Sequence, residues 1–271
     1  MKYEIIKEKA LSRGAAFCEV IKLEDLDFNT FAKSLSRYPE GLSYLKKNEN
    51  KIKNPKLWFE GAQSVLICLF PYWDKTRNWE EENKKISDPE IFLKNNGRKI
   101  PDFLKGNKIK ISRFALGPDY HISIRKILES ALLESKKEIP DLSWKIFVDS
   151  SPVSEKIWAE AAGLAFIGKN TLAVNEYIGS YFFIGGAMLN LKEGIKPQKT
   201  KSLCADCSRC VFSCPTKALE PYSLNPLKCI SYWTTHNKKN VVPPKEIEKE
   251  CSDKYGCDIC QKVCPYNKNY D

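Results

Sequence analysis

CADCSRCVFSCPTKAL, residues 204–219, is the stretch that decides the fold of the C-terminal part of this chain. Its cysteines follow the spacing C-x2-C-x2-C-x3-C-P, which is typical of iron-sulfur clusters. They are Cys204, Cys207, Cys210 and Cys214. In paired clusters the fourth cysteine of such a run binds the other cluster, so the chain should carry a second run.

The second run is CDICQKVCPYN, residues 257–267, which supplies the last three cysteines of the same pattern. Lys254 stands where its first cysteine would fall, so either Cys229 or Cys251 completes the second site. The crossed arrangement predicts one cluster on Cys204, Cys207, Cys210 and Cys264, and the other on Cys214, Cys257, Cys260 and one of those two.

Zinc is the rival for these cysteines, because C-x2-C pairs also have zinc-ligand spacing. Zinc sites use isolated pairs, whereas here one run holds four cysteines and the C-x3-C-P ending occurs twice. The pattern therefore favours two 4Fe-4S clusters. Two clusters so close together can transfer electrons from one to the other, and these electrons need an acceptor elsewhere in the chain.

Length and composition predict one large domain, residues 1–198, and a small cluster domain, residues 199–271. The net charge of +10 leans towards an anionic partner, although a merely basic surface would explain it equally well. The N-terminus has no secretory signal, and no apolar run reaches membrane-spanning length. We therefore expect a cytoplasmic protein without membrane contact, in which clustered cysteines are metal ligands rather than disulfides.

The first domain has the alternating pattern of an α/β fold. Helical periodicity covers residues 2–13, 25–36 and 39–47, and a longer helix should begin after a capping Asp119. Strands are expected over 15–23 and 145–148, and the apolar run 64–72 indicates a strand buried on both faces. The run SYFFIGGAML follows turn residues 175–179 and suggests a hairpin or neighbouring strands.

Residues 73–110 turn polar and charged, and we expect a long surface insertion with a helix over 88–95. A loop of that length usually covers a site or binds something. It adds a basic patch made of Lys94, Arg98, Lys99, Lys105, Lys108 and Lys110.

Three places in the first domain could carry chemistry. Tyr120 and His121 lie at the start of the expected helix, although a lone histidine is more often structural. Asp149 ends a strand, before a helix that Ser150-Ser151-Pro152 should cap, so it is either a site residue or a helix-capping carboxylate. A turn holds Gly168, Lys169, Asn170 and Thr171 but lacks the pattern of a phosphate-binding loop. No flavin or nicotinamide fingerprint is present, so the redox partner of the clusters leaves no simple motif.

The chain resembles the cobalamin-dependent epoxyqueuosine reductases that finish queuosine in tRNA. The resemblance covers most of Ile111–Asn267, and it rests on ISRFALGPDYH, VDSSPVSEKIWAEAAGLAFIGKNTLAV, LNPLKCISYW and the two cysteine runs. It implies an α/β cobalamin-binding domain followed by a bacterial-ferredoxin-like domain. It makes Cys229 the missing cluster ligand and Asp149 the proton donor, and it implies cobalamin contacts at Tyr120, Gly168, Lys169, Asn170 and Thr171.

The resemblance also implies a reaction and its partners. Low-valent cobalamin, supplied with electrons by the clusters, would reduce epoxyqueuosine at the wobble base of tRNA. Asp149 would need to be protonated near neutral pH, which burial beside the apolar corrin face would favour by desolvation. The partners would be the tRNA anticodon stem-loop and an electron-donor protein, with the chain a monomer that lacks the helical-repeat domain of longer members.

The basic residues of 73–110 could replace the tRNA contacts of that helical-repeat domain, in which case binding would weaken steeply with salt. Two alternatives stay open at this point. One is a reductase of a small molecule, similar to reductive dehalogenases. The other is a non-catalytic electron-transfer or RNA-binding protein.

Overall fold

The structure is a computed structural model that describes residues 1–270 except 25, 27–46, 150, 199 and 238–240. The helices expected over 25–36 and 39–47 therefore lie almost entirely outside the described residues. The first helix, α1 (Lys2–Leu11), confirms the one expected over 2–13.

One four-stranded antiparallel sheet forms the centre of the first domain. It contains β1 (Phe17–Lys22), β2 (Ser64–Pro71), β7 (Phe182–Leu189) and β4 (Trp144–Val148), in that order. Three of these strands match the strands expected at 15–23, 64–72 and 145–148. The fourth, β7, crosses between β2 and β4. A Cβ at Gly186 would lie 2.0 Å from the carbonyl oxygen of Leu66, so the centre of β7 requires glycine.

The turn expected at residues 175–179 is present, since the Asn175 amide donates to the Gly179 carbonyl at 2.8 Å. The strands on its two sides do not pair with each other as a hairpin. The short strand β6 (Ala173–Val174) pairs with β5 (Phe166–Ile167), and β7 joins the large sheet instead.

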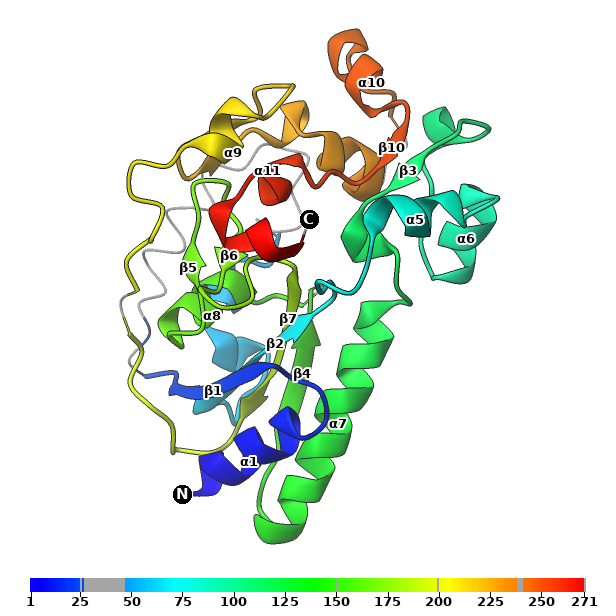
Figure 1. The fold of residues 1–271 in the computed structure, drawn as a ribbon. Helices are drawn as coiled ribbons and strands as arrows, with labels where there is room; N and C mark the ends of the chain where they lie inside the picture. Colours follow the sequence, from blue (N-terminus) through cyan, green and yellow to red (C-terminus); the bar gives the residue numbers. More distant parts are fainter. Residues whose placement is uncertain (25, 27–46, 150, 199, 238–240, 271) are drawn as a thin grey trace.

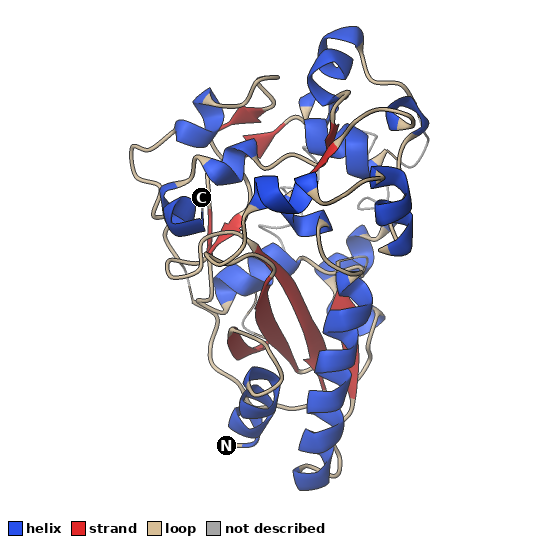
Figure 2. Cartoon of the chain, turned by 45° about the vertical axis from the view of Figure 1, so that its right-hand side comes forward, coloured by secondary structure: helices blue, strands red, loops and turns tan. Residues whose placement is uncertain are grey.

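Helices cover both faces of the sheet. On one face α1 packs against the long helix α7 (Tyr120–Glu138), and the shared core includes Ile6, Leu66 and Leu128. On the other face α8 (Glu155–Ala161) packs its Trp158 on Phe147. Figure 1 shows α1 and α7 beside the sheet, and Figure 2 shows short helices and strands gathered beyond one end of it. The sheet is therefore closed on both faces and open at that end.

Residues 72–116 form a folded unit rather than the expected long loop. The unit contains α5 (Trp79–Lys84), α6 (Pro89–Asn95), the 3-10 turns η3 (Asp102–Leu104) and η4 (Arg113–Ala115), and the strand β3 (Lys110–Ile111). Helix α6 confirms the helix expected over 88–95. Trp73, Leu93 and Leu104 are buried in a core of their own, which is why the polar segment folds. Ahead of β2 lie α4 (Glu49–Lys53) and η2 (Pro55–Leu57).

The cysteine segment is made of short elements. They are α9 (Arg209–Phe212), β8 (Leu219–Glu220), β9 (Ser223–Leu224), η5 (Pro226–Lys228), η6 (Tyr232–His236, a π-helical turn), α10 (Lys245–Cys251), β10 (Lys254–Tyr255), α11 (Ile259–Lys262) and η7 (Pro265–Tyr270). In Figure 1 these elements lie together around the open end of the sheet.

The cysteine segment shares structure with the first domain. Strand β10 pairs in parallel with β3, and Tyr255 is buried in the core of the 72–116 unit. The buried Asn267 accepts a hydrogen bond from the Ser180 amide at 2.8 Å, and Gln261 donates to the Ser180 carbonyl at 2.9 Å. The boundary at residue 198 stays a prediction, but the two parts pack as neighbours with a common core. Within the described ranges, no helix combines the length and apolar character needed to cross a bilayer.

Candidate active site and cluster segment

Asp149 lies directly after β4, at the open end of the sheet, with a left-handed backbone (φ 53°). Its amide donates to Oε1 of Glu155 at 2.5 Å. Helix α8 begins only at Glu155, after Ser154. Before it, the Val153 side chain is buried in the core and the Val153 amide donates to the Ser151 carbonyl. The cap predicted at Ser151-Pro152 is therefore wrong, and Ser150 is not described. The left-handed backbone of Asp149 is uncommon for a residue other than glycine, so the surrounding structure must hold Asp149 in it.

Two side chains from the first turn of α7 bind the Asp149 carboxylate. The Tyr120 hydroxyl donates to Oδ2 at 2.5 Å, and Nε2 of His121 lies 3.4 Å from the same oxygen. Asp119 caps the helix as expected, and its Oδ1 also lies 2.8 Å from Nδ1 of His121. His121 thus bridges two carboxylates, which leaves neither of its nitrogens free for another ligand.

An aromatic stack fixes Tyr120. Its ring lies parallel to that of Phe183 in β7, with centroids 3.8 Å apart, and His121 stacks on its other side at 4.1 Å. The sheet and α7 therefore set the direction of both donors to Asp149. The lone-histidine interpretation underrated His121, since its sequence neighbours gave no sign of the carboxylate from β4.

The charges of this site oppose the expected protonation of Asp149. Burial raises the pKa of Asp149, but hydrogen bonds from His121 and Tyr120 outweigh it and leave the pKa below its ordinary value. His236, from the cysteine segment, lowers the pKa further. The pKa of His121 is raised, mainly by its bond to Asp149. Both shifts favour the ion pair of His121 and Asp149, with the proton on the imidazole, over a neutral Asp149.

Glu155 carries the opposite shift. Burial and the charge of Asp149 raise the pKa of Glu155 to about 8, so this carboxyl is largely protonated at neutral pH. Two carboxyl groups whose surroundings push their pKa values apart are the usual arrangement for acid and base roles in one site. Sequence reasoning missed Glu155 and His236. A signal for His236 was available, because the chain has only two histidines.

The thiols of the cysteine segment lie close enough to influence one another. After burial, the pKa of Cys264 is raised by Cys204, Cys210 and Cys207. The pKa of Cys257 is raised by burial and then by nearby groups that include Cys229 and Cys214, and that of Cys260 by burial, then by Cys257 and Cys229, and also by Cys210. The division of the ligands between two clusters stays a prediction. Cys251 lies apart, fully buried beside Ile230 and Trp233.

The donor set consists of cysteine thiols, which are the usual ligands of four-iron clusters. A four-iron cluster binds each thiolate to a different iron, so its four sulfurs do not have to converge on one point. Backbone amides also point at the sulfurs, from Lys169 to Cys204 at 3.4 Å and from Ala218 to Cys214 at 3.3 Å. Such N–H···S bonds tune the potential of a bound cluster.

The turn from Gly168 to Thr171 joins the two parts of the molecule. Nζ of Lys169 donates to the Ala205 carbonyl at 2.8 Å, and Nδ2 of Asn170 donates to the Cys260 carbonyl at 3.3 Å. Thr171 has a left-handed backbone (φ 65°), and its carbonyl accepts from Lys156. These side chains thus contact the cysteine segment, and their assignment to a cofactor stays a prediction. The structure does not bring this turn into contact with Tyr120, the other predicted cofactor residue.

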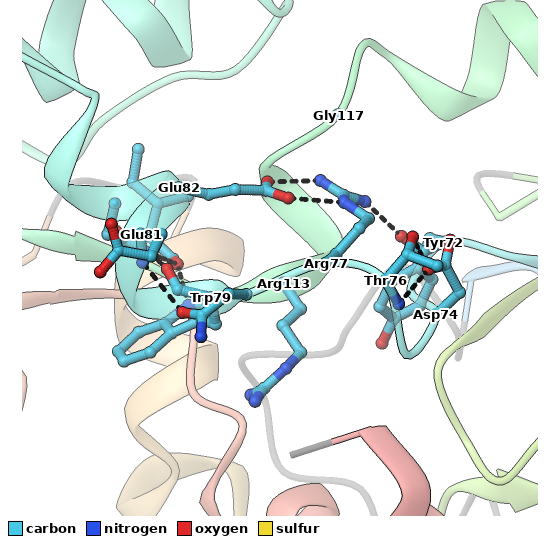
Figure 3. A network of polar contacts seen from close by, with 12 residues as sticks. Tyr72, Asp74, Thr76, Arg77, Trp79, Glu81, Glu82, Arg113 and Gly117 are labelled. Atoms are coloured by element: carbon cyan, nitrogen blue, oxygen red, sulfur yellow. Dashed lines mark hydrogen bonds and ion pairs between the residues drawn. The ribbon is translucent and has the colours of Figure 1, made fainter.

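The 72–116 unit has polar contacts both within itself and to its surroundings, among them the bond from the Arg113 amide to Asp258 of the cysteine segment. Figure 3 shows Arg77 bonded to both carboxylate oxygens of Glu82 and to the Tyr72 carbonyl, at 2.6–2.7 Å. Arg98 donates to the carbonyls of Asn96 and Gly117 at 3.0 and 2.8 Å, just ahead of the first turn of α7. Arg98 is therefore engaged in holding the Asp119-Tyr120-His121 turn, and we remove it from the basic patch.

Two family models match the chain. The model described as "Epoxyqueuosine reductase QueG, DUF1730" matches residues 53–150, and the one described as "4Fe-4S double cluster binding domain" matches residues 203–267. The second match confirms the prediction of two clusters. The first spans the 72–116 unit, so that unit belongs to the family's own domain.

The chain is also similar to whole proteins. An epoxyqueuosine reductase from Prochlorococcus marinus is 40% identical over 98% of this chain and 78% of that protein. A crystal structure of epoxyqueuosine reductase with an epoxyqueuosine-modified tRNA stem loop is 27% identical, with a TM-score of 0.76 over 99% of this chain and 66% of that one.

Two further structures bear on the site and the fold. In a structure from Bacillus subtilis (25% identical, TM-score 0.77, 99% of this chain and 66% of that one), an aspartate-bearing catalytic loop is swung out of the active site. A reductive dehalogenase associated with a B12-dependent mechanism shares the fold at 16% identity, with a TM-score of 0.53 over 97% of this chain and 31% of that one.

Proposed function

The chain belongs to the epoxyqueuosine reductase family, and from that premise we propose that it reduces epoxyqueuosine in tRNA to queuosine with the side chains gathered around Asp149. The observation that carries the proposal is the Asp149, His121 and Tyr120 constellation beside the thiols of the cysteine segment. The side chains around Asp149 can deliver protons, and the thiol-bound clusters can deliver electrons. A non-catalytic electron carrier would not need the side chains around Asp149.

The stoichiometry of the reaction explains why several acids are present. Converting an epoxide to an alkene and water takes up two electrons and two protons. The first proton converts the opened alkoxide to a hydroxyl group, and the second lets that oxygen leave as water. We assign delivery to Asp149, which takes a proton from His121 and passes it to the substrate oxygen. Glu155 holds the second proton, 2.5 Å from the Asp149 amide.

We propose that the eight thiols hold two 4Fe-4S clusters, with ligands Cys204, Cys207, Cys210 and Cys264 in one and Cys214, Cys229, Cys257 and Cys260 in the other. Cobalamin, when bound, would supply a low-valent cobalt nucleophile, and its electrons would come from the two clusters. The residues positioned for it are those around Tyr120 and Asp149. The side chains of Asp149 and His121 are 53% and 40% exposed here, and His236 of the cluster segment acts on the same carboxylate. A flat redox group at this place would contact both parts of the molecule.

The substrate is a tRNA stem-loop, and its base must be splayed into the open end of the sheet. We propose phosphate contacts from Lys94, Lys99, Lys105, Lys108 and Lys110, without the internally bonded Arg98. The protein is proposed to act as a cytoplasmic monomer that receives electrons from a separate donor protein.

The substrate assay tests the proposal directly. Protein reconstituted with iron, sulfide and cobalamin should convert epoxyqueuosine in a tRNA stem-loop to queuosine under anaerobic reduction, which nucleoside mass spectrometry detects as the loss of one oxygen. Full cluster and cobalamin content without conversion would contradict the proposal. Conversion of a small halogenated aromatic instead would favour the dehalogenase-like alternative.

The pH dependence of kcat should report Glu155. Because its pKa is raised to about 8, the group donates below that pH, and kcat should fall as the pH rises through it. Glu155→Gln keeps the acceptor for the Asp149 amide but holds no transferable proton, so kcat should be lower and the fall near pH 8 absent. The stability of the fold should change in the same range of pH. The pKa of Glu155 is higher in the folded chain than its ordinary value of 4.5, so the protonated group stabilises the fold at low pH. This contribution should be lost as the pH rises to about 8.

Glu160→Gln in the same helix is the matched control, because burial also raises the pKa of Glu160 but nothing connects it to Asp149. This variant should keep the wild-type pH profile. A fall near pH 8 that survives in Glu155→Gln would assign the proton to another group.

A further inference from the structure

A pocket on the outer face of the cysteine segment is not used by the chemistry described above. It has a volume of about 540 Å³ and lies between α9 and the chain around α11 and η7, which pack together. Its lining includes Cys264, one of the thiols assigned to the first cluster, together with Arg209, Phe212, Lys262 and Lys268. A cluster bound there would lie at the wall of an open pocket.

The surface around the pocket is both apolar and cationic. Phe212 is 86% exposed, the highest value among the large hydrophobic side chains that the structure describes. Arg209, Lys262 and Lys268 are exposed, and within the described part of the chain none of them forms an ion pair with a carboxylate. An exposed aromatic among cations is the composition of a protein interface rather than of an ordinary solvated face.

The location separates this surface from the substrate site. The acids Asp149 and Glu155 lie at the end of β4, next to the first turn of α7, whereas the pocket is formed by α9, α11 and η7. Figure 1 shows α9 and α11 side by side in the cysteine segment, with β5 and β6 between them and the large sheet. A substrate base bound beside Asp149 has no need of Cys264, whereas an electron donor must approach a cluster ligand closely.

We propose that the pocket formed by Arg209, Phe212, Lys262 and Lys268 is the docking site of an acidic one-electron carrier protein, which reduces the cluster held by Cys264. This inference rests on the proposed function of the thiols as cluster ligands. Each docking event oxidises one carrier by one electron and reduces the cluster by one electron, so two events supply one turnover. Phe212 fills an apolar contact at the centre, and the three cations steer the acidic partner.

The partner is an electron carrier rather than RNA because of what the pocket exposes. Phosphates would be served equally well by lysines anywhere on this basic chain, whereas this pocket places cations that form no ion pair among the described residues beside a thiol assigned to the first cluster. Small, salt-sensitive interfaces are also typical of transient electron-transfer complexes.

Anaerobic stopped-flow reduction by an acidic plant-type 2Fe-2S ferredoxin tests the site on the cluster-loaded chain. The double variant Lys262→Glu, Lys268→Glu should lower the second-order reduction rate at low salt by about tenfold or more, and the difference should shrink as salt rises. Phe212→Ala should slow reduction at all salt concentrations. Lys126→Glu, which lies on the distant face of α7, is the matched control and should behave as wild type.

Three further readings separate the possible failures. Iron and sulfide content must match wild type, and dithionite must reduce every variant at the same rate, which shows that the clusters are intact. Equal ferredoxin rates in all variants would overturn the docking site while leaving the proposed function standing. Unchanged ferredoxin rates combined with weaker tRNA stem-loop binding would also overturn it and would make this an RNA-binding surface. Absence of clusters in wild type would instead overturn the proposed function.

Discussion

Replacing Asp149 by Asn is expected to lower kcat by about 10²–10⁴-fold while leaving iron, sulfide and cobalamin content unchanged. The magnitude is that of losing a positioned general acid. The amide side chain still accepts from Tyr120, whose hydroxyl lies 2.5 Å from the carboxylate, so the local fold has little reason to change. What disappears is the transfer of the proton held on His121, because an amide does not exchange it. Single-turnover kinetics with epoxyqueuosine-containing stem-loop would measure the loss.

The Asp149→Asn variant needs a control in which another carboxylate near β4 is replaced in the same way. Asp141 is exposed in the turn ahead of β4, and its carbonyl but not its carboxylate is bonded to Asn190. Asp141→Asn should therefore retain wild-type kcat. Near-normal turnover of Asp149→Asn would remove Asp149 from the proton path and would point to Tyr120 or Glu155 as the direct donor.

Replacing Cys229 by Ala should abolish turnover and reduce the iron content from about eight to about four atoms per chain. The chain offers a matched control in Cys251, the other candidate left open by the spacing. Cys229 lies beside Cys214, whereas Cys251 is buried against Ile230 and Trp233 with its thiol directed to the Glu248 carbonyl. Cys251→Ala should keep about eight irons and full activity, at a cost of about 1 kcal/mol in stability.

Anaerobic iron and sulfide analysis with electron paramagnetic resonance of the reduced protein would distinguish the two variants. Loss of iron in Cys251→Ala with none in Cys229→Ala would reverse the ligand assignment. Partial loss in both would indicate that the second cluster exchanges ligands.

The sequence predicts local features of this protein well and distant contacts poorly. The strand ending at Val148, the cap at Asp119 and the buried run 64–72 all follow from local periodicity, and the structure has each of them. The polar segment 73–110 looked like a loop because its few large apolar residues are widely spaced. They nevertheless meet in one core, since Trp73 and Leu104 pack with Tyr255 from the cysteine segment.

The same limit applies to the site. The spacing of the cysteines predicts the crossed groups because the rule is local and chemical. The group of residues around Asp149 could not be predicted that way, since His121 comes from α7, Asp149 from the end of β4, Glu155 from α8 and His236 from η6. Opposing effects on the pKa of Asp149 also require the positions of its donors, because burial alone would have predicted the wrong direction.

The pairing of β10 with β3 has a consequence for biosynthesis. On the ribosome the strand Lys110–Ile111 emerges long before Lys254–Tyr255, and until then its edge and the core around Trp73 lack their last partner. The earlier part of the chain can form its main sheet, but the region beside the substrate site must wait for the thiol-bearing residues. The core around Trp73 therefore cannot be completed until the chain has been made as far as Tyr255, by which point five of the eight predicted cluster ligands have also been made.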